Sequence, residues 1–345
     1  MKKVAINKFR SREAPLITIG ITCFNAEETI EIALRSAFSQ DWSNYEVIVV
    51  DDGSSDNSIA ILKKWKLKKN NLKIFYNTLN KGCAFSRNKI IEKAKGIFIA
   101  FYDDDDHSRY DRIRLQYEKL TDYEKSKKIK IAACFASGKR IYKNGYILKI
   151  KAVGTEGTPP IGLQMADYLL FFKRIPKIAY GAGVPTYSLF IRTSILKKLN
   201  GFDVKMRRQE DVDFGIRMAM ENGHFIGIIE PVITQYANES KDKTALIEYE
   251  RSLRLIKKFY TYLEAKGLYR YMKLWLKLRY FHFISREFMA FLILMKIFLI
   301  YPVRTINHFS RSAFNRFIHE KLMSLKSKNL NSLNKCVKFL NHLIY

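Results

Sequence analysis

The sequence predicts an α/β fold: a Rossmann-like, mostly parallel sheet with helices on both faces, followed by a C-terminal helical region. Short, continuously apolar segments alternate with segments of helical apolar spacing through the first two thirds of the chain. Strands that are apolar along their whole length are typical of a parallel sheet buried on both sides. From about Thr244 onward the strand-like segments stop and only helical spacing remains.

The individual elements follow from local patterns. Glu27–Phe38 has helical apolar spacing, and Ser55 and Asp56 are N-cap residues for a helix that we expect to reach about Lys69. Further helices are expected near Phe85–Ala94, from Asp111 to about Lys125, and from about Gln209. The predicted strands are Leu16–Thr22, Glu46–Val50, Leu72–Tyr76, Ile97–Tyr102, Lys130–Phe135 and Tyr187–Arg192. The sequence KNGY at Lys143–Tyr146, between two strand-like flanks, predicts a β-hairpin.

We expect two domains, residues 1–240 and a basic, aromatic-rich helical region at 241–345. The formal net charge is +28, and Ala245–Tyr345 contains 19 Lys and Arg against 5 Asp and Glu. Arg270, Lys273 and Lys277 share one helical face beside the apolar residues Leu274, Leu278 and Phe281. Further amphipathic surface comes from Trp275, Tyr280 and the apolar run after Phe288. This pattern favours contact with an anionic membrane surface, and the alternative is an ordinary helical subdomain packed on the α/β core.

The compartment is indicated by three features. The N-terminal sequence MKKVAINKFRSREAPL has neither an apolar h-region nor a small-residue cleavage site, so a cytoplasmic location is expected. The apolar run Phe288–Val303 contains Lys296 and is shorter than the roughly 20 residues of a spanning helix, which favours a buried or membrane-surface helix. Cys23, Cys83, Cys134 and Cys336 are widely spaced, as free thiols in a reducing compartment would be.

Acidic residues gather where predicted strands end. Asp103–Asp106 are four consecutive carboxylates after an apolar strand, and Asp51-Asp52-Gly53 ends another strand. Because the carboxyl ends of parallel strands share one edge of a sheet, these side chains should meet in one crevice together with Thr22. Such oxygen ligands suit Mg²⁺ or Mn²⁺ bound to a diphosphate. The alternative is a solvated turn, since Asp also favours caps and turns.

Four motifs carry a family resemblance. They are ITIGITCFNAEETIEIALRSAFSQDWSNYEVIVVDDGSSDNS, NKGCAFSRNKII, GIFIAFYDDDD and LNGFDVKMRRQEDVDFGIRM. From about Leu16 to Tyr236 the chain resembles the family 2 glycosyltransferases of GT-A fold, of the bacterial cell-envelope polysaccharide or lipopolysaccharide type. The resemblance implies an inverting, metal-dependent enzyme that uses a nucleotide-sugar, in the first instance a UDP-sugar. Its acceptor would be a hydroxyl of a glycan or of a lipid-linked glycan.

The resemblance also implies a donor site. Thr22 and Phe24 would line the nucleobase site, and Asp52 would accept a hydrogen bond from the base or ribose. Arg87 would meet the diphosphate, and Asp104 belongs to the same donor-binding set. Each residue has a structural alternative: Asp52 could cap the turn before Gly53, Arg87 could be a surface helix residue, and Thr22 and Phe24 could belong to the core.

Metal binding and catalysis are implied by two further segments. Asp105 would coordinate the Mn²⁺ or Mg²⁺ ion, with Asp103 as a second metal or ribose contact. Asp211 would be the general base, and Gln209 and Glu210 would contact the acceptor or the sugar. The alternative for Glu210 and Asp211 is an acidic first helical turn, which the helix dipole favours whatever the function.

One departure from the family and two other functions complete the expectations. Ala237 and Asn238 stand where family members often carry a histidine, and His224 lies too early to replace it. A nucleotidyltransferase is an alternative, although Gly20 lies within the first strand and not in a phosphate loop. A nucleic-acid-binding protein is the other, but no such motif is present and an acidic crevice repels phosphates, so no nucleic acid partner is expected.

Overall fold

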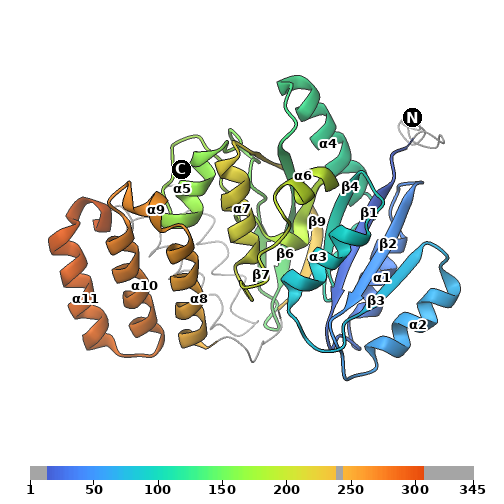
Figure 1. Ribbon diagram of the computed structural model, residues 1–345, viewed down its shortest axis with the longest axis horizontal. Helices are drawn as coiled ribbons and strands as arrows, with labels where there is room; N and C mark the ends of the chain where they lie inside the picture. Colours follow the sequence, from blue (N-terminus) through green and yellow to red (C-terminus); the bar gives the residue numbers. More distant parts are fainter. Residues whose placement is uncertain (1–13, 238–243, 307–345) are drawn as a thin grey trace. The chain divides into compact units, whose positions relative to one another are not determined.

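The computed structural model describes residues 14–237 and 244–306 of the 345-residue chain. The chain divides into two compact units (Figure 1). Among the described residues, the first unit contains residues 14–139 and 149–235, and the second contains residues 140–148, 236–237 and 244–306. The predicted pair of functional domains, 1–240 and 241–345, stays a prediction.

The first unit is built on a mixed sheet whose first four strands run parallel. Its strands are β1 (Ile17–Cys23), β2 (Tyr45–Asp51), β3 (Leu72–Tyr76), β4 (Phe98–Asp103), β5 (His107–Ser108), β6 (Ala132–Ile141), β7 (Ile147–Ile150), β8 (Leu189–Arg192) and β9 (His224–Tyr236). Their order is β3-β2-β1-β4-β8-β6-β9-β5, with β7 beside β6. β1 pairs in parallel with β2 and β4, and β2 with β3. The pairs β4–β8, β6–β8 and β5–β9 are antiparallel.

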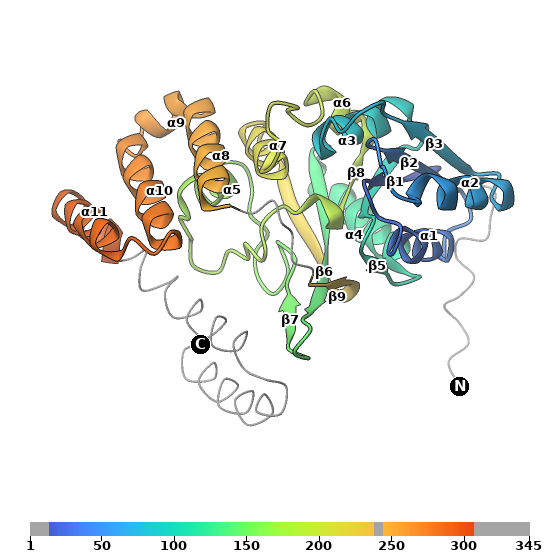
Figure 2. The same ribbon diagram turned by 90° about the horizontal axis from the view of Figure 1, so that it is seen from below.

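Helices cover both faces of the parallel strands (Figure 2). The helices of this unit are α1 (Ile30–Phe38), α2 (Ser58–Lys68), α3 (Cys83–Lys93), α4 (Arg112–Lys127), α5 (Leu163–Phe171), α6 (Thr193–Lys198) and α7 (Glu210–Met220), and of these α5 and α7 pack against each other. Side chains alternate along a strand, so Ile19 of β1 packs into the core that holds α1, while Gly20 faces α3. A Cβ at Gly20 would lie 2.6 Å from Cγ2 of Ile90, so glycine there lets α3 approach the sheet. These layers confirm the predicted α/β fold.

Two helices begin later than the sequence predicts, because their first residues make tertiary hydrogen bonds. The Glu27 N–H donates to Asp56 Oδ2 at 2.9 Å, and the Glu27 carboxylate accepts from the Asn57 N–H at 2.9 Å. α1 therefore starts at Ile30. The Ser55 N–H donates to Asn25 Oδ1 at 2.8 Å, so Ser55 is not the cap of α2, which starts at Ser58.

The predicted hairpin joins β6 and β7. Gly145 has φ of 82°, which glycine adopts without strain, and the Tyr142 N–H donates to the Tyr146 carbonyl at 2.9 Å. β6 extends to Ile141, beyond the predicted end at Phe135, because its second half pairs with β7.

Apart from residues 140–148, which form the tip of the β6–β7 hairpin, and residues 236–237 at the end of β9, the described part of the second unit is helical, as the loss of strand patterns predicts. It contains α8 (Ala245–Lys258), α9 (Tyr260–Glu264), α10 (Tyr269–Phe283) and α11 (Glu287–Ile300). Thr244 caps α8, since its side chain accepts from the Ile247 N–H at 3.3 Å. Trp275 and Leu278, which the sequence places beside the basic face of α10, are buried. Within the described ranges, no helix is long and apolar enough to cross a membrane.

Candidate active site

A cavity of about 350 Å³ lies at the carboxyl ends of β1, β2 and β4. Its lining residues are Thr22, Cys23, Phe24, Asp52, Asn80, Gly82, Cys83, Arg87, Asp103, Asp104 and Asp105. The parallel register explains the convergence, because it sets Thr22 beside Asp103 and Cys23 beside Asp51. Every residue that the sequence predicts for donor or metal binding therefore lines one cavity.

The loop after β1 presents an aromatic ring and holds one of the four aspartates. Phe24 is 45% exposed, so its ring is available to a planar partner. Its N–H donates to Asp104 Oδ2 at 3.0 Å. Burial raises the pKa of Asp104 to about 8, and the charges of Asp105 and Asp103 act in the same direction. Asp104 thus links the loops after β1 and β4.

Asp52, at the end of β2, holds the loop that leads into α3. Its Oδ1 accepts from Asn77 Nδ2 at 2.7 Å and from the Lys81 N–H at 3.1 Å. Its Oδ2 accepts from the Gly82 N–H at 2.8 Å. The carboxylate is buried and also lines the cavity, so it shapes one wall. Asn80, Gly82 and Cys83 of this wall were not singled out as site residues from the sequence.

Arg87 of α3 connects two acidic segments that are far apart in the chain. Its Nη1 donates to Glu210 Oε1 at 2.5 Å, and its Nη2 lies 3.4 Å from Asp103 Oδ1. The Cys83 thiol donates to the same Glu210 oxygen at 3.0 Å. Arg87 and Glu210 are both buried, and each compensates the charge of the other, which would be costly to bury without a partner.

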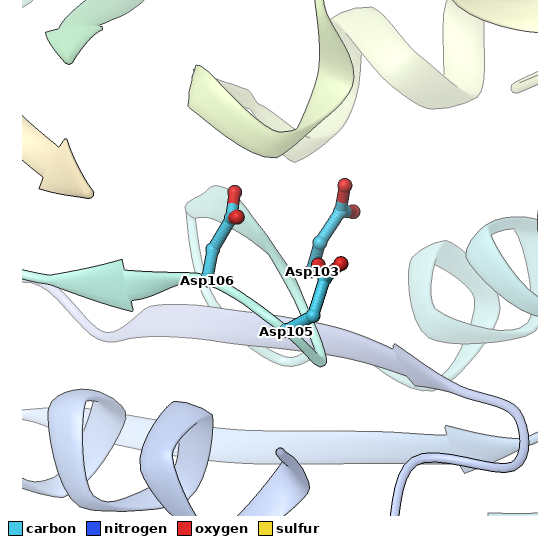
Figure 3. A group of neighbouring side chains, drawn as sticks. All are labelled: Asp103, Asp105 and Asp106. Carbon is cyan, nitrogen blue, oxygen red and sulfur yellow. The ribbon is translucent and has the colours of Figure 1, made fainter. Parts of the chain in front are cut away.

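Three carboxylates gather on the loop after β4. Ligand oxygens of Asp103, Asp105 and Asp106 lie within 4.8 Å of one another, and Figure 3 shows them on one side of the loop. Burial raises the pKa of Asp106 to about 8, and the Asp103 and Asp105 charges add to this effect. Gln235 of β9 donates from Nε2 to Asp106 Oδ2 at 2.9 Å. The residues fit a hard divalent cation, which takes oxygen ligands and would neutralise the crowded charge.

Asp106 belongs to the acidic run that the sequence places at the crevice, but the predicted metal ligands were Asp105 and Asp103 and did not include Asp106. The run of four aspartates identifies the loop, but only its turn decides which carboxylates converge. Gln235 was missed as well, although it lies just before Ala237, one of the two positions expected to replace the family histidine. Asn238 lies outside the described residues. His224 is hydrogen-bonded through Nδ1 to the Tyr123 hydroxyl at 3.0 Å and is not part of the aspartate cluster.

The predicted base lies in the first turn of α7. Gln209 is the N-cap residue and has a left-handed backbone, with φ of 63°, so the chain turns sharply just before Glu210 and Asp211. Burial is the main cause that raises the pKa of Asp211 to about 6, and the Glu210 charge adds to it while Arg87 opposes it. A carboxylate with such a pKa is ionised at neutral pH and accepts a proton more readily than an ordinary one.

Part of the chain is similar in sequence to known proteins. Residues 18–171 match the family described as Glycosyl transferase family 2. An uncharacterized glycosyltransferase of Haemophilus influenzae is 38% identical over 102 residues, which are 30% of this chain and 41% of that protein. A UDP-Glc:alpha-D-GlcNAc-diphosphoundecaprenol beta-1,3-glucosyltransferase, WfgD of Escherichia coli, is 36% identical over 105 residues, 30% of this chain and 41% of that protein. The matches thus span about two fifths of these relatives.

The fold also resembles a solved structure. The crystal structure of S. aureus TarS 1–349 in complex with UDP-GlcNAc matches this chain with a TM-score of 0.56 and 19% sequence identity. The match covers 84% of this chain and 82% of the TarS chain. At this identity the likeness concerns the fold alone.

Proposed function

Because residues 18–171 form a glycosyl transferase family 2 domain, we propose that this protein moves a sugar from a nucleotide-sugar to a hydroxyl group of an acceptor. The observation that carries the proposal is the convergence of Phe24, Asp52, Arg87 and Asp103 on one cavity. A flat ring, a carboxylate, a guanidinium and a metal-type carboxylate are the groups that a nucleotide diphosphate requires.

The donor would lie along this cavity. The nucleobase would stack on Phe24 near Thr22, and Asp52 would accept a hydrogen bond from the base or ribose. Asp104 would support this end of the site through the Phe24 N–H. Arg87 would hold the diphosphate, because its planar guanidinium offers paired donors to phosphate oxygens.

A divalent cation, Mn²⁺ or Mg²⁺, fits the cluster of Asp103, Asp105 and Asp106, and when bound it would offset the negative charge of the diphosphate. Arg87 would stabilise the same charge as it grows on the leaving group. Because Arg87 also donates a hydrogen bond to Glu210, its position depends on the start of α7.

Asp211 would then act as the general base. Its carboxylate would take the proton of the acceptor hydroxyl while that oxygen bonds to the anomeric carbon and the bond from this carbon to the diphosphate oxygen breaks. A single base on the face opposite the leaving group gives inversion of configuration without a covalent intermediate. Gln209 and Glu210, on either side of the turn into α7, would contact the sugar or the acceptor, with Glu210 acting mainly through Arg87.

Donor and acceptor classes are proposed from the relatives. WfgD is named for UDP-Glc and a lipid diphosphate acceptor, and the TarS structure contains UDP-GlcNAc. We therefore propose a UDP-sugar as the donor and a glycan, free or lipid-linked, as the acceptor. The reaction would belong to cell-envelope polysaccharide or lipopolysaccharide synthesis, at the inner face of the cell membrane.

Donor hydrolysis tests the proposal. UDP-, GDP- and dTDP-sugars are each incubated with the purified protein and Mn²⁺ or Mg²⁺, and the products are separated. Release of a nucleoside diphosphate from one donor supports the proposal. Formation of pyrophosphate would instead indicate a nucleotidyltransferase, and no binding of any nucleotide by calorimetry would contradict the donor site.

A further inference from the structure

The helix α11 is apolar on the side that faces away from its neighbour α10. Ala290, Ile293 and Ile297 are buried, and α11 packs against α10 (Figure 2). Spacings of three and four residues place Phe288, Leu292, Met295 and Leu299 on the opposite side of the helix. Phe288 is 73% exposed and Leu299 is 76% exposed. The outer side therefore presents a continuous apolar stripe, called here the α11 outer face.

The α11 outer face is a contiguous apolar patch, not a set of isolated exposed apolar residues. Phe283 and Ile284 before the helix and Val303 after it are also exposed, so further apolar side chains lie near both ends of the stripe. None of the residues with described positions covers it. Contiguous exposed apolar surface of this kind marks a contact site, since a helix that is apolar all round is stable only when it is covered.

The charges around the stripe indicate what covers it. Arg286 precedes the helix, Arg304 follows it and Lys296 lies on its flank, and all three are exposed. Residues 245–306 contain 12 Lys and Arg against 4 Asp and Glu. Basic side chains at both ends and along one flank can reach the phosphates of a bilayer while the stripe enters the acyl region. An apolar groove on a protein partner would not require this basic border.

The helix length fixes how such a contact would be made. α11 has 14 residues and is about 21 Å long, which is shorter than the roughly 30 Å hydrocarbon core of a bilayer. It would therefore lie in the plane of the interface.

We propose that the α11 outer face docks on an anionic lipid bilayer, with α11 parallel to the surface and Arg286, Lys296 and Arg304 against the headgroups. The sequence suggests contact with an anionic membrane surface, and this proposal assigns that contact to a defined set of residues on α11. It keeps the apolar run Phe288–Val303, for which the sequence favours a buried or membrane-surface helix, and it leaves out α10, whose Trp275 and Leu278 are buried. The docking does not depend on the proposed sugar transfer.

Vesicle co-sedimentation of the full-length protein tests the proposal. The protein should bind vesicles that contain phosphatidylglycerol more tightly than vesicles of phosphatidylcholine alone. Phe288→Ser and Leu299→Ser should each weaken the partition coefficient at least roughly tenfold, because each removes a large apolar side chain from the interface. Leu67→Ser is the matched control, because Leu67 lies on α2 and is 87% exposed. It should leave binding unchanged.

A second measurement identifies the occupant of the outer face. In the Leu299→Trp variant, brominated phosphatidylglycerol should quench additional fluorescence relative to the wild type. Quenching equal to that of the wild type, with a blue-shifted emission before vesicles are added, would overturn the proposal and assign the face to residues 307–345.

Two further outcomes separate the remaining explanations. Loss of self-association by light scattering in Leu299→Ser, with vesicle binding unchanged, would overturn the proposal in favour of a second copy of the chain. Nucleotide binding in the absence of vesicles should be the same for wild type and all variants, so a failure of docking is distinguishable from a failure of the proposed function.

Discussion

Arg87 donates a hydrogen bond to Glu210 at 2.5 Å, although the two residues are 123 positions apart in the chain. Arg87 belongs to α3, which packs on the parallel sheet, and Glu210 begins α7. Asp211 follows Glu210 directly. The pair therefore fixes the proposed base relative to the proposed diphosphate site, and the predictions below depend on this link.

Replacement of the base should stop transfer without loss of donor binding. Asp211→Asn keeps the size of the side chain but removes its ability to take a proton. We expect turnover to fall by about 10² to 10⁴, the usual contribution of general base catalysis, with an unchanged dissociation constant for the donor. Steady-state kinetics and calorimetry check the two parts. Glu221→Gln, at the exposed C-terminal end of α7, is the control, and wild-type turnover in Asp211→Asn would refute the assignment.

The pH profile should report the same residue. Because the proposed base must be ionised, and the pKa of Asp211 is raised to about 6, activity at saturating Mn²⁺ should increase with pH through about 6 and level off above it. Glu210→Gln removes a negative neighbour that raises this pKa, so the acidic limb should move to lower pH. The measurement is kcat/KM against pH for both proteins. An acidic limb that stays in place in Glu210→Gln would show that another group titrates.

Cation binding should depend on three aspartates and not on acidity in general. Asp105→Asn and Asp106→Asn each remove one carboxylate from the cluster, so calorimetry with Mn²⁺ should show affinity weakened at least roughly tenfold. Asp122→Asn removes an exposed carboxylate on α4 and should have no effect. Equal Mn²⁺ affinity in wild type and Asp106→Asn would exclude Asp106 from the site.

The exposed ring of Phe24 should matter for the donor alone. Phe24→Ala removes the proposed stacking surface, which is worth about 0.5 to 1.5 kcal/mol, so donor KM should rise by a factor of roughly two to thirteen. Turnover should change little, because the ring contacts the nucleobase and not the reacting carbon. Phe24→Tyr keeps the ring and should behave like wild type. A lower kcat with normal KM in Phe24→Ala would place the ring elsewhere.

Arg112 should contribute to stability more than any surface arginine. Its side chain is fully buried and donates hydrogen bonds to Gln116 Oε1, Ser108 Oγ, Phe101 O and Tyr187 O at 2.8 to 3.0 Å. Arg112→Gln leaves several of these acceptors unsatisfied, so the free energy of unfolding should fall by about 3 kcal/mol or more.

Arg114→Gln is the control for the stability change expected of Arg112→Gln. Arg114 is partly exposed and pairs with the exposed carboxylates of Asp41 and Glu118 and, at 3.8 Å, with Asp111, so Arg114→Gln should cost about 1 kcal/mol. Urea unfolding followed by circular dichroism measures both variants. Similar losses in the two would mean that the buried network is not a major source of stability.

Strand patterns predict the fold well because a parallel strand buried on both faces accepts apolar residues at almost every position. Leu72–Tyr76 was predicted with the bounds that β3 has, since apolar residues are bounded there by polar turn residues. Helix starts were less accurate. Glu27 and Ser55 look like first-turn and cap residues, but tertiary hydrogen bonds to Asn57 and Asn25 hold them outside the helices. Local preference cannot anticipate such partners.

The candidate site, like the helix starts, could be predicted from the sequence only in part. The sequence indicates which loop carries the carboxylates, because four aspartates follow a buried strand. It does not indicate that Asp104 turns to the Phe24 N–H while Asp106 joins the cluster with Gln235, since that depends on the turn and on a strand more than a hundred residues later.

The aspartate cluster comes from four successive residues, whereas the base is carried to its place by α7. The cluster needs one distant contact, from Gln235 of β9, whereas the separation between Asp211 and Arg87 depends on the placement of two whole helices, α3 and α7. On gradual heating the protein should therefore lose the proposed sugar transfer before the proposed uptake of manganese, so retained uptake of the ion in a preparation would not show that the proposed catalyst is intact.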